Sequence, residues 1–565
     1  MKRYRSTAAA VAMLLLGTAL AWAASPAPVR ARHGMVVSVE RHASQAGIEI
    51  FRRGGNAVDA AIATALALAV THPSAGNIGG GGFLLIRFAD GRTTFLDFRE
   101  RAPAAASRDM YLDASGQVIP EASTVGPKAA GVPGTVAGLE YASRKYGKLP
   151  WSKLVAPAVR LATRGFPVSY ELARSLSSAG TTKLLSRFPE SKRIFLRDGR
   201  PYQQGEKFAQ QNLARTLKRI QRGGAREFYQ GETARRLAAF MQKAGGLITL
   251  ADLEGYKVVE RAPVTGSYHG YQITSAPPPS SGGTVLLEML NILEAVPLAE
   301  KGAQSADAIH WTTEAMRRAF ADRARYLGDP DFVKVPVRGL IDKKYAEKLR
   351  ASIDPQHASL SSAVGAGDPL PYESAETTHL SVIDKDGNAA ALTYTLNGGY
   401  GCGVTAEGLG FLLNNEMDDF SSKPGVPNMY GLIQGEANAI APGKRPLSAM
   451  TPTIVTHEGK LALVTGSPGG PTIINTVLNI LLDVIDYKMG VQQAVDAPRF
   501  HHQWLPDELR VEPGFSPDTL ALLKGRGHKV VTRSSIGDAH SIAVAPDGLL
   551  LGAADPRLGG KAIGY

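Results

Sequence analysis

Thr377 stands where a strand is expected to begin, in the stretch Glu376-Thr377-Thr378-His379-Leu380-Ser381-Val382. If the bond between Glu376 and Thr377 is cut, the threonine hydroxyl and a free α-amine belong to one residue. An α-amine has a pKa of about 8, so near neutral pH a share of it is uncharged and can accept the hydroxyl proton. Threonine with its own N-terminal amine is an activated nucleophile. The stretch therefore favours a self-cleaving chain, although a threonine pair at a strand start is also ordinary β-propensity.

A β-hairpin is expected around this threonine. Residues 377–383 alternate, and the turn sequence Asp384-Lys385-Asp386-Gly387-Asn388 separates them from a second run, 389–397. Asp-Gly between two such runs indicates a hairpin, and a three-residue loop would place Gly387 in the left-handed conformation. That register pairs residues whose numbers sum to 772, so Thr395 would lie opposite Thr377. The hairpin thus offers a second hydroxyl beside the nucleophile, or merely a stabilising cross-strand pair.

The segment before the cut, residues 351–376, is rich in Ser, Ala, Gly and Pro and has no clear period. A long structureless stretch of this kind is typical of a functional loop or of a linker. The segment before the cut is therefore expected to be either a functional loop or an ordinary interdomain linker.

Separated motifs in a consistent order make nearly all of the chain resemble the γ-glutamyltranspeptidases, a family of N-terminal-nucleophile hydrolases. The early motifs are Gly54-Gly55-Asn56-Ala57-Val58-Asp59-Ala60-Ala61, Gly79-Gly80-Gly81-Gly82-Phe83, Asp97-Phe98-Arg99-Glu100, Gly131-Val132-Pro133-Gly134 and Pro279-Ser280-Ser281-Gly282-Gly283. The later ones are Thr377-Thr378-His379, Asn414-Asn415-Glu416-Met417-Asp418-Asp419-Phe420, Lys444-Arg445-Pro446-Leu447-Ser448 and Gly466-Ser467-Pro468-Gly469-Gly470. The resemblance implies cleavage before Thr377, with a large subunit of residues 24–376 and a small catalytic subunit of residues 377–565. It also implies an α+β fold, the αββα sandwich of stacked antiparallel sheets covered by helices.

The same resemblance implies an activity. The enzyme would transfer the γ-glutamyl group of glutathione and related γ-glutamyl compounds to water or to an amino acid or dipeptide acceptor, with no cofactor. Thr377 would carry the γ-glutamyl ester. The N–H groups of Gly469 and Gly470 would form the oxyanion hole, since a tetrahedral oxyanion needs preorganised donors.

A γ-glutamyl donor carries an α-carboxylate and an α-ammonium, so its pocket needs a cationic and an acidic partner. The Arg99 guanidinium can grip a carboxylate through two hydrogen bonds, and Ser448 can add a hydroxyl donor. Asp419 and Glu416 suit the ammonium, together with Asn397 as a neutral acceptor. Without the resemblance, Arg99-Glu100 would suggest a surface ion pair and Asp418-Asp419 solvated loop charges.

The stretch of residues 422–431 resembles the family's lid loop, in which Tyr430 would close the pocket. Three positions depart from the family's pattern. Ala449 stands where many members have a second serine, and Glu416 where bacterial members often have glutamine. Cys402 replaces a hydroxyl residue, and it is expected to be a small buried residue.

The first residues of the chain and its net charge indicate where the protein is located and which ligands are not expected. Residues 1–23 suggest a signal peptide, with Lys2 and Arg3 before an apolar run and Ala21-Trp22-Ala23 as its cleavage site. An uncleaved anchor is the alternative, although the run is short for a membrane span. Periplasmic or secreted localisation follows, without stable membrane insertion. The net charge of +12 comes with no aromatic-interleaved basic block, so nucleic-acid binding is not indicated.

Other functions remain open at this stage. The first alternative keeps the nucleophile but changes the donor, as in a cephalosporin (glutaryl) acylase or a γ-polyglutamate amidase. The second is a non-catalytic secreted binding protein that stays in one piece. No GxSxG, phosphate-loop or HExxH pattern supports a serine, nucleotide or zinc-protease chemistry. The pair His501-His502 has no partners in sequence, so no metal site is expected.

The elements expected to position these residues change in type along the chain. Helices are expected over 38–53 and 56–71, the second apolar nearly all round and therefore buried, then through most of 123–250 and over 306–327. After residue 377 strands predominate, with one long helix. The strands are expected over 377–383, 389–396, 409–414, 452–457, 460–465 and 541–552, and the helix over 471–488.

Overall fold

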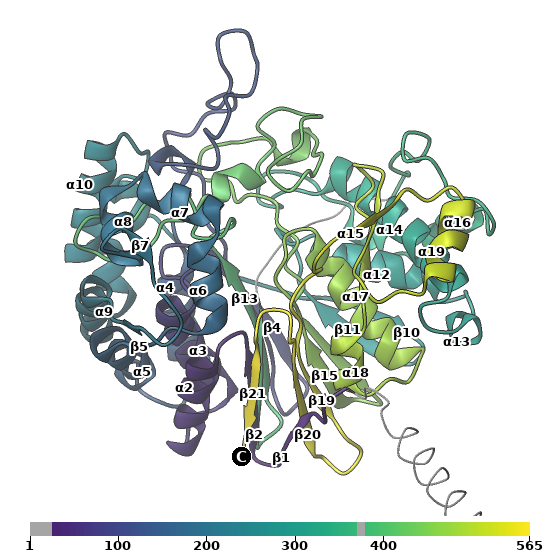
Figure 1. The fold of residues 1–565 in the computed structure, drawn as a ribbon, viewed down its shortest axis with the longest axis horizontal. Helices are drawn as coiled ribbons and strands as arrows, with labels where there is room; N and C mark the ends of the chain where they lie inside the picture. Colours follow the sequence, from purple (N-terminus) through teal and green to yellow (C-terminus); the bar gives the residue numbers. More distant parts are fainter. Residues whose placement is uncertain (1–24, 370–378) are drawn as a thin grey trace, which may run out of the picture.

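A computed structural model of the protein describes residues 25–369 and 379–565. Its centre is a pair of seven-stranded antiparallel sheets, each covered on its outer face by helices (Figure 1). The buried residues between the sheets include Val37 and Phe83 from one and Val464 and Ile542 from the other. This arrangement confirms the expected αββα sandwich.

Both sheets contain strands from before and from after residues 370–378. The order in the first sheet is β21 (Lys561–Gly564), β2 (Gly34–Ser38), β12 (Leu380–Asp384), β13 (Ala389–Thr395), β3 (Gly81–Arg87), β4 (Thr93–Phe98) and β9 (Val259–Arg261). The order in the second is β1 (Val29–Ala31), β20 (Leu550–Ala554), β19 (His540–Val544), β15 (Lys460–Thr465), β14 (Thr453–His457), β11 (Tyr271–Ser275) and β10 (Val264–Tyr268).

Two helical layers complete the sandwich. The first sheet is covered by helices that include α2 (Arg41–Arg52), α3 (Ala57–Thr71), α4 (Thr135–Tyr146), α5 (Trp151–Arg164), α6 (Tyr170–Ser177), α9 (Gln211–Gln230) and α10 (Glu232–Ala244). The second is covered by α12 (Gly282–Leu293), α14 (Ala306–Tyr326), α16 (Lys343–Ala351), α17 (Thr472–Ile485), α18 (Val491–Asp496) and α19 (Pro517–Gly525). No helix within residues 25–369 and 379–565 is both long and apolar enough to cross a membrane.

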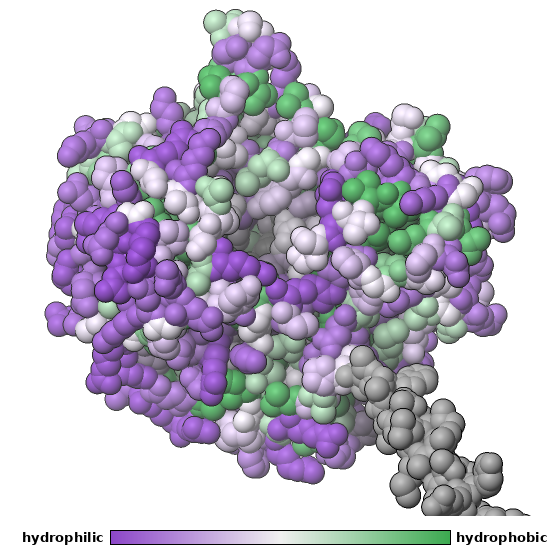
Figure 2. Space-filling view, viewed as in Figure 1, coloured by the Kyte–Doolittle hydropathy of each residue, from purple (hydrophilic) through white to green (hydrophobic). Residues whose placement is uncertain are grey.

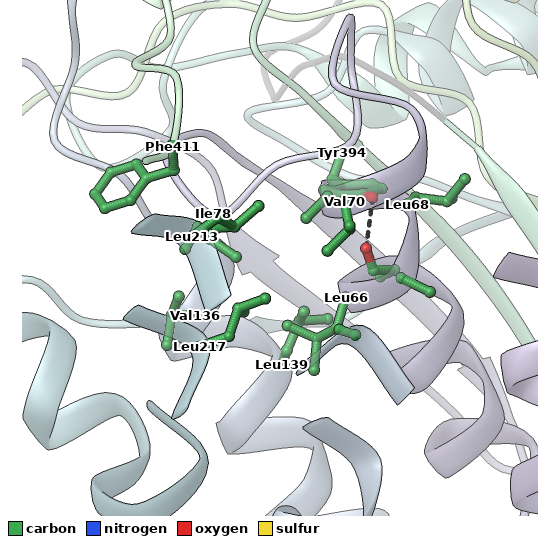
Figure 3. Close-up of a cluster of buried hydrophobic side chains, with 14 of the residues drawn as sticks. Leu66, Leu68, Val70, Ile78, Val136, Leu139, Leu213, Leu217, Tyr394 and Phe411 are labelled. Atoms are coloured by element: carbon green, nitrogen blue, oxygen red, sulfur yellow. Dashed lines mark hydrogen bonds between the residues drawn. The ribbon is translucent and has the colours of Figure 1, made fainter. Parts of the chain in front are cut away.

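Helix α3 is buried along its whole length, as its sequence predicts. Asn56 and Asp59 form a reciprocal capping box that satisfies the first backbone N–H groups of the helix. Apolar side chains of α3, including Leu66 and Val70, belong to the same buried cluster as Leu217 of α9 (Figure 3). The Tyr394 hydroxyl of β13 donates to the carbonyl oxygen of Ala65 at 2.9 Å, the dashed line in Figure 3. Strand β13 is thereby fastened to helix α3.

The predicted hairpin register is confirmed where the structure describes it. Leu380 pairs with Leu392 and Ile383 with Ala389, so the numbers of each pair sum to 772. Gly387 takes a φ of 84°, as the turn requires. Thr377 itself lies outside the described residues, so its pairing with Thr395 stays a prediction.

Two strand predictions were wrong in detail. Residues 409–414 form no strand; only Leu412 makes an isolated bridge, to Thr405. Gly410 there has a φ of 80°, and a Cβ on it would lie 2.3 Å from the Leu213 nitrogen, so the segment crosses helix α9 instead of joining a sheet. The stretch 541–552 is two paired strands, β19 and β20, because Gly548 turns the chain with a φ of 81°.

Candidate active site

A cavity of about 850 Å³ opens between the two helical layers, on a face that is hollowed near its centre (Figure 2). All of the predicted site residues that the structure describes line it: Arg99, Thr395, Asn397, Glu416, Asp419, Tyr430, Ser448, Gly469 and Gly470. The predicted cleavage residues Glu376 and Thr377 lie outside the described residues. The cavity therefore gathers side chains that are hundreds of residues apart in the sequence.

Arg99 follows directly after β4 and is completely buried. Its Nη2 donates to Asp419 Oδ2 at 2.6 Å, and its Nη1 lies 2.7 Å from Glu416 Oε1. Glu100 Oε2 is 3.5 Å from the same Nη1. Three buried carboxyl groups thus surround one guanidinium, so the expectation of a solvated surface pair, considered without the resemblance, does not hold.

Burial shapes the protonation of these carboxyl groups. Desolvation raises the pKa of Asp419 to about 6 and that of Glu100 to about 7, although the nearby Arg99 charge acts in the opposite direction. The pKa of Glu416 is raised well above its usual range for the same reason. Apart from the 2.7 Å ion pair with Arg99, the Glu416 oxygens have no hydrogen-bond partner among the described residues. The site is therefore short of positive charge and of donors, which is a suitable environment for a ligand ammonium.

Glu416 and Asp419 belong to one short 3-10 turn, η2 (Glu416–Asp419). The turn is fixed from behind because Gln434 and Asn438 both donate from their side-chain amides to the Asp419 carbonyl oxygen, at 3.0 and 2.6 Å. Ser448 is placed by the Pro279–Gly283 motif, in which the Ser281 hydroxyl donates to the Ser448 carbonyl at 2.9 Å. The carboxylates and the serine are thus held by backbone contacts of their own segments.

The glycine pair Gly469-Gly470 lies in the loop between β15 and α17, with φ angles of 132° and 57°. Their carbonyl oxygens accept from the first turn of α17, at Thr472 and Ile473. Among the described residues, no acceptor receives a hydrogen bond from either glycine N–H. Two backbone donors are therefore available to the cavity, as an oxyanion hole requires.

Tyr430 covers this glycine pair. A Cβ on Gly470 would lie 3.0 Å from Tyr430 Cδ1, and the tyrosine hydroxyl donates to the Asn397 carbonyl oxygen at 2.8 Å. Asn397 adopts a left-handed φ of 71° and donates from its side chain to the Asn415 carbonyl at 3.0 Å. Tyr430 thus spans the cavity from the glycine loop to the end of β13.

Thr395 is the last residue of β13, and its Oγ1 accepts from the Asn397 N–H at 2.8 Å. Accepting leaves the hydroxyl proton to donate. Asn77 holds the Thr395 carbonyl with a 2.8 Å hydrogen bond, and a Cβ on Gly80 would lie only 2.0 Å from that carbonyl oxygen. The glycine run before β3 therefore allows the close approach that positions Thr395.

Comparison with known proteins agrees with this geometry. The profile of the gamma-glutamyltranspeptidase family matches residues 43–565. The chain belongs to the γ-glutamyltranspeptidase family. It is 53% identical to the glutathione hydrolase proenzyme of Escherichia coli strain K12, over 97% of each chain.

Solved structures of related proteins have the same fold as this chain. The cephalosporin acylase from Bacillus halodurans superposes with a TM-score of 0.86 at 30% identity and covers 96% of this chain and 98% of its own. The γ-glutamyltranspeptidase of Helicobacter pylori gives a TM-score of 0.58 at 45% identity, covering 61% of this chain and 96% of its own. The fold is thus shared with γ-glutamyltranspeptidases and with an acylase.

Several residues at the site of this γ-glutamyltranspeptidase-family chain carried no prediction. Asn77 and Asp418 hold site segments through hydrogen bonds to the Thr395 carbonyl and the Met429 N–H, and His379 lies in the cavity wall. The His379 Nε2 and the Ser381 hydroxyl are 2.8 Å apart, and burial lowers the pKa of the histidine well below its usual range. The adjacent acidic pair at 418–419 was visible in the sequence, but its burial was not.

The structure also shows the surroundings of Cys402, Ala449, His501 and His502, which the sequence analysis singled out. Cys402 is buried, and burial raises the pKa of its thiol to about 12, so it is not a second nucleophile. Ala449 is buried in the apolar cluster under the site. His501 and His502 are also buried, each hydrogen-bonded to a neighbouring side chain. Within the described parts of the chain, no group of three or more His, Cys, Asp or Glu side chains is arranged to hold a metal ion.

Proposed function

We propose that this chain is the precursor of a γ-glutamyltransferase that also hydrolyses glutathione and related γ-glutamyl compounds. The observation that carries the proposal is the Arg99 guanidinium flanked by Asp419 and Glu416 in the same cavity as the Gly469-Gly470 pair. A γ-glutamyl donor presents an α-carboxylate, an α-ammonium and an amide carbonyl, and these three groups match the three parts of the site.

Maturation precedes turnover in this proposal. The Thr377 hydroxyl attacks the Glu376 carbonyl carbon, the peptide nitrogen leaves as the new α-amine, and water hydrolyses the ester to leave a carboxylate on residue 376. The products are a large subunit of residues 24–376 and a small subunit of residues 377–565. The freed amine then serves as the base for the same hydroxyl.

In turnover, Thr377 Oγ attacks the γ-carbonyl of the donor while its proton passes to the α-amine. The oxyanion is bound by the N–H groups of Gly469 and Gly470, and the proton leaves with the released amine. Water, an amino acid or a dipeptide then attacks the γ-glutamyl ester. Thr395 donates its hydroxyl proton toward the nucleophile, and Tyr430 closes the cavity over the acyl group.

Donor recognition divides between two charges. Arg99 and Ser448 bind the α-carboxylate, while Asp419, Glu416 and Asn397 receive the α-ammonium. In the free protein the acidic groups neutralise Arg99. The bound donor brings one positive and one negative charge, so its binding leaves the net charge of the site unchanged. The cavity continues past the site to Glu171, Arg174 and Lys561, which leaves room for the rest of a peptide donor or for an acceptor.

Export is part of the proposal. The basic start of the chain, the apolar run and Ala21-Trp22-Ala23 support removal of residues 1–23 and a periplasmic or secreted location. N-terminal sequencing of the large subunit from fractionated cells tests it: a mature chain that begins at residue 24 in the exported fraction is the expected result. A large subunit that begins at Met1 would contradict it.

The γ-glutamyl assignment is tested by a pair of anilides that differ by one amine. A glutaryl anilide lacks only the α-ammonium of the γ-glutamyl anilide, so Asp419 would keep its contact with Arg99 but would have no ligand ammonium to receive. Such a loss costs about 2–5 kcal/mol, so kcat/KM for the glutaryl compound should be lower by roughly two orders of magnitude. Asp419→Asn should reduce kcat/KM for the γ-glutamyl anilide far more than for the glutaryl one.

Equal kcat/KM values for the two anilides would overturn the assignment and favour an acylase of the cephalosporin type. Preferential release of glutamate from γ-linked polyglutamate would favour an amidase of that polymer. A chain that stays in one piece on a denaturing gel and hydrolyses neither anilide would be a binding protein.

A further inference from the structure

The lid around Tyr430 is fixed from within its own segment and from outside it. The Asn428 side-chain oxygen accepts from the Tyr430 and Leu432 N–H groups, at 3.0 and 3.1 Å, which makes a tight turn. The Gln503 side chain donates to the Tyr430 carbonyl at 3.3 Å. These contacts shape the turn that carries the tyrosine, but they leave open what holds the chain entering it.

Asp418 holds that entry. Its Oδ2 accepts from the Met429 N–H at 3.0 Å, one residue before Tyr430, and its Oδ1 accepts from the Ser123 hydroxyl at 2.6 Å. Both Asp418 and Ser123 are buried. The two oxygens of one carboxylate thus join the lid to a residue almost 300 positions earlier in the chain.

Ser123 belongs to a protruding loop, residues 103–126, which stands out from the top of the molecule (Figure 1). Two further hydrogen bonds join this loop to the segments around the lid. The Asn415 side chain donates to the Thr124 carbonyl at 3.0 Å, and Lys423 Nζ donates to the Gly116 carbonyl at 2.8 Å. The protruding loop is therefore the outer support of the lid.

Apolar packing between the loop and the lid is incomplete. A cavity of about 210 Å³ separates them, lined by Val118 and Ile119 of the loop and by Pro427 and Met429 of the lid. Because the two segments do not pack closely along this space, apolar packing alone does not hold them together. The hydrogen bonds, and the buried one at Asp418 above all, set the position of the lid against the loop.

We propose that Asp418 and Ser123 are positioning residues for the lid: the Asp418 carboxylate, oriented by the Ser123 hydroxyl of the protruding loop, holds Met429 so that Tyr430 covers the Gly469-Gly470 pair. The adjacent carboxyl groups thus have separate tasks, since Asp419 faces Arg99 within the donor site and Asp418 faces away from it. The inference about turnover rests on the proposed function, whereas the inference about lid position does not.

The lid position is tested by amide hydrogen exchange on the substrate-free protein. Asp418→Ala removes the acceptor of the Met429 N–H, and exchange over residues 428–432 should quicken by about tenfold, the effect of losing one charge-assisted hydrogen bond. Ser123→Ala should quicken the same segment to a smaller degree. Ser115→Ala is the matched control, because Ser115 bonds only within the protruding loop, to Asp113.

Asp418→Asn tests whether the hydrogen bonds made by residue 418, and not its negative charge, protect the segment. Its side-chain oxygen can accept from the Met429 N–H and its amide can donate to Ser123 Oγ, so it should keep the protection that alanine loses. Unchanged exchange over residues 428–432 in both Asp418→Ala and Ser123→Ala would overturn the proposal, whatever the enzyme's substrate proves to be.

The kinetic test is a double-mutant cycle with Tyr430→Ala, measured with the γ-glutamyl anilide. Asp418→Ala alone should raise KM by about tenfold with little change in kcat, and Asp418→Asn should restore KM. If Asp418 acts through the lid, adding Asp418→Ala to Tyr430→Ala should change nothing further. Additive losses would show that Asp418 acts on the donor site directly and would overturn the proposal.

Discussion

At the scale of single residues, the site's electrostatics centre on one cation among three buried carboxyl groups. Arg99 balances one negative charge, and burial raises the pKa of Asp419 to about 6 because ionisation in this environment is unfavourable. A bound ammonium would relieve that cost. Donor affinity should therefore depend on whether Asp419 is ionised when the substrate arrives.

A pH profile checks this dependence. As the pH falls through about 6, Asp419 takes up a proton and loses the charge that attracts the ammonium, so kcat/KM for the γ-glutamyl anilide should decline on the acid side of that value. The glutaryl anilide has no ammonium and should lack this acid limb. An acid limb of equal midpoint and depth for both anilides would assign the titration to another group.

Separate alanine substitutions of Thr377 and of its neighbour Thr378 test which residue is the nucleophile. Thr377→Ala removes the hydroxyl that attacks the Glu376 carbonyl, so this variant should remain a single chain on a denaturing gel and release no anilide. Thr378→Ala keeps that hydroxyl and should still be cut. Two normal-sized fragments from the Thr377→Ala protein would refute the cleavage site.

At the scale of elements, short loops rather than helices or strands shape the catalytic surface. Gly469 and Gly470 take positive φ angles and line the cavity, and Tyr430 packs where a side chain on Gly470 would stand. The strands behind them fix the loop ends, because β15 is an inner strand of its sheet and α17 is buried on the same side.

Two glycine substitutions distinguish the role of the Gly469-Gly470 loop in the cavity from the effect of backbone strain alone. Gly470→Ala and Gly459→Ala both force alanine into a positive φ, at 57° and 75°, and each should cost about 1–2 kcal/mol of stability. Only Gly470→Ala also places a methyl 3.0 Å from the Tyr430 ring, whereas the space around Gly459 is empty. Gly470→Ala alone should therefore lower kcat/KM, on the order of tenfold or more. Thermal unfolding and anilide kinetics measured together would distinguish the two, and an equal loss of activity in both variants would contradict the loop's role.

At the scale of the whole molecule, the two sides of the predicted cut are interleaved. In the first sheet β12 lies between β2 and β13, and β13 pairs with β3, so strands from before and after residues 370–378 share hydrogen-bond ladders. In the second sheet β1 pairs with β20 and β11 with β14. Cleavage before Thr377 would remove one peptide bond and none of these ladders.

The fragments should therefore stay together after cleavage. Gel filtration of the cut protein under native conditions should give one species that contains both fragments, and they should separate only in denaturant. Uncut Thr377→Ala protein supplies the size reference. Elution of a free residue 377–565 fragment without denaturant would contradict the interleaved arrangement.

Local features of the sequence predicted much of this protein. The Asp-Gly turn set the register of the β12–β13 hairpin because hairpin geometry depends on a few adjacent residues. The apolar run of 56–71 required a buried helix, and the family's motifs identified the residues that line the cavity. In each of these cases, neighbouring residues or a whole motif carried the information.

Contacts between distant segments were decided only by the tertiary structure. The sequence could not show that Asp418 is buried and faces Ser123, because a carboxylate loses its solvation only when another segment covers it. Nor could it show that residues 409–414 cross α9 rather than pair, since that choice depends on Gly410 meeting Leu213. Arg99 and Asp419 are 320 positions apart, and the stacked sheets bring them within hydrogen-bonding distance. Local propensity and sequence motifs therefore determined the helices, the hairpin and the types of residue available for chemistry. Packing between the layers determined which charged side chains meet and which of them contact the segment that carries Tyr430.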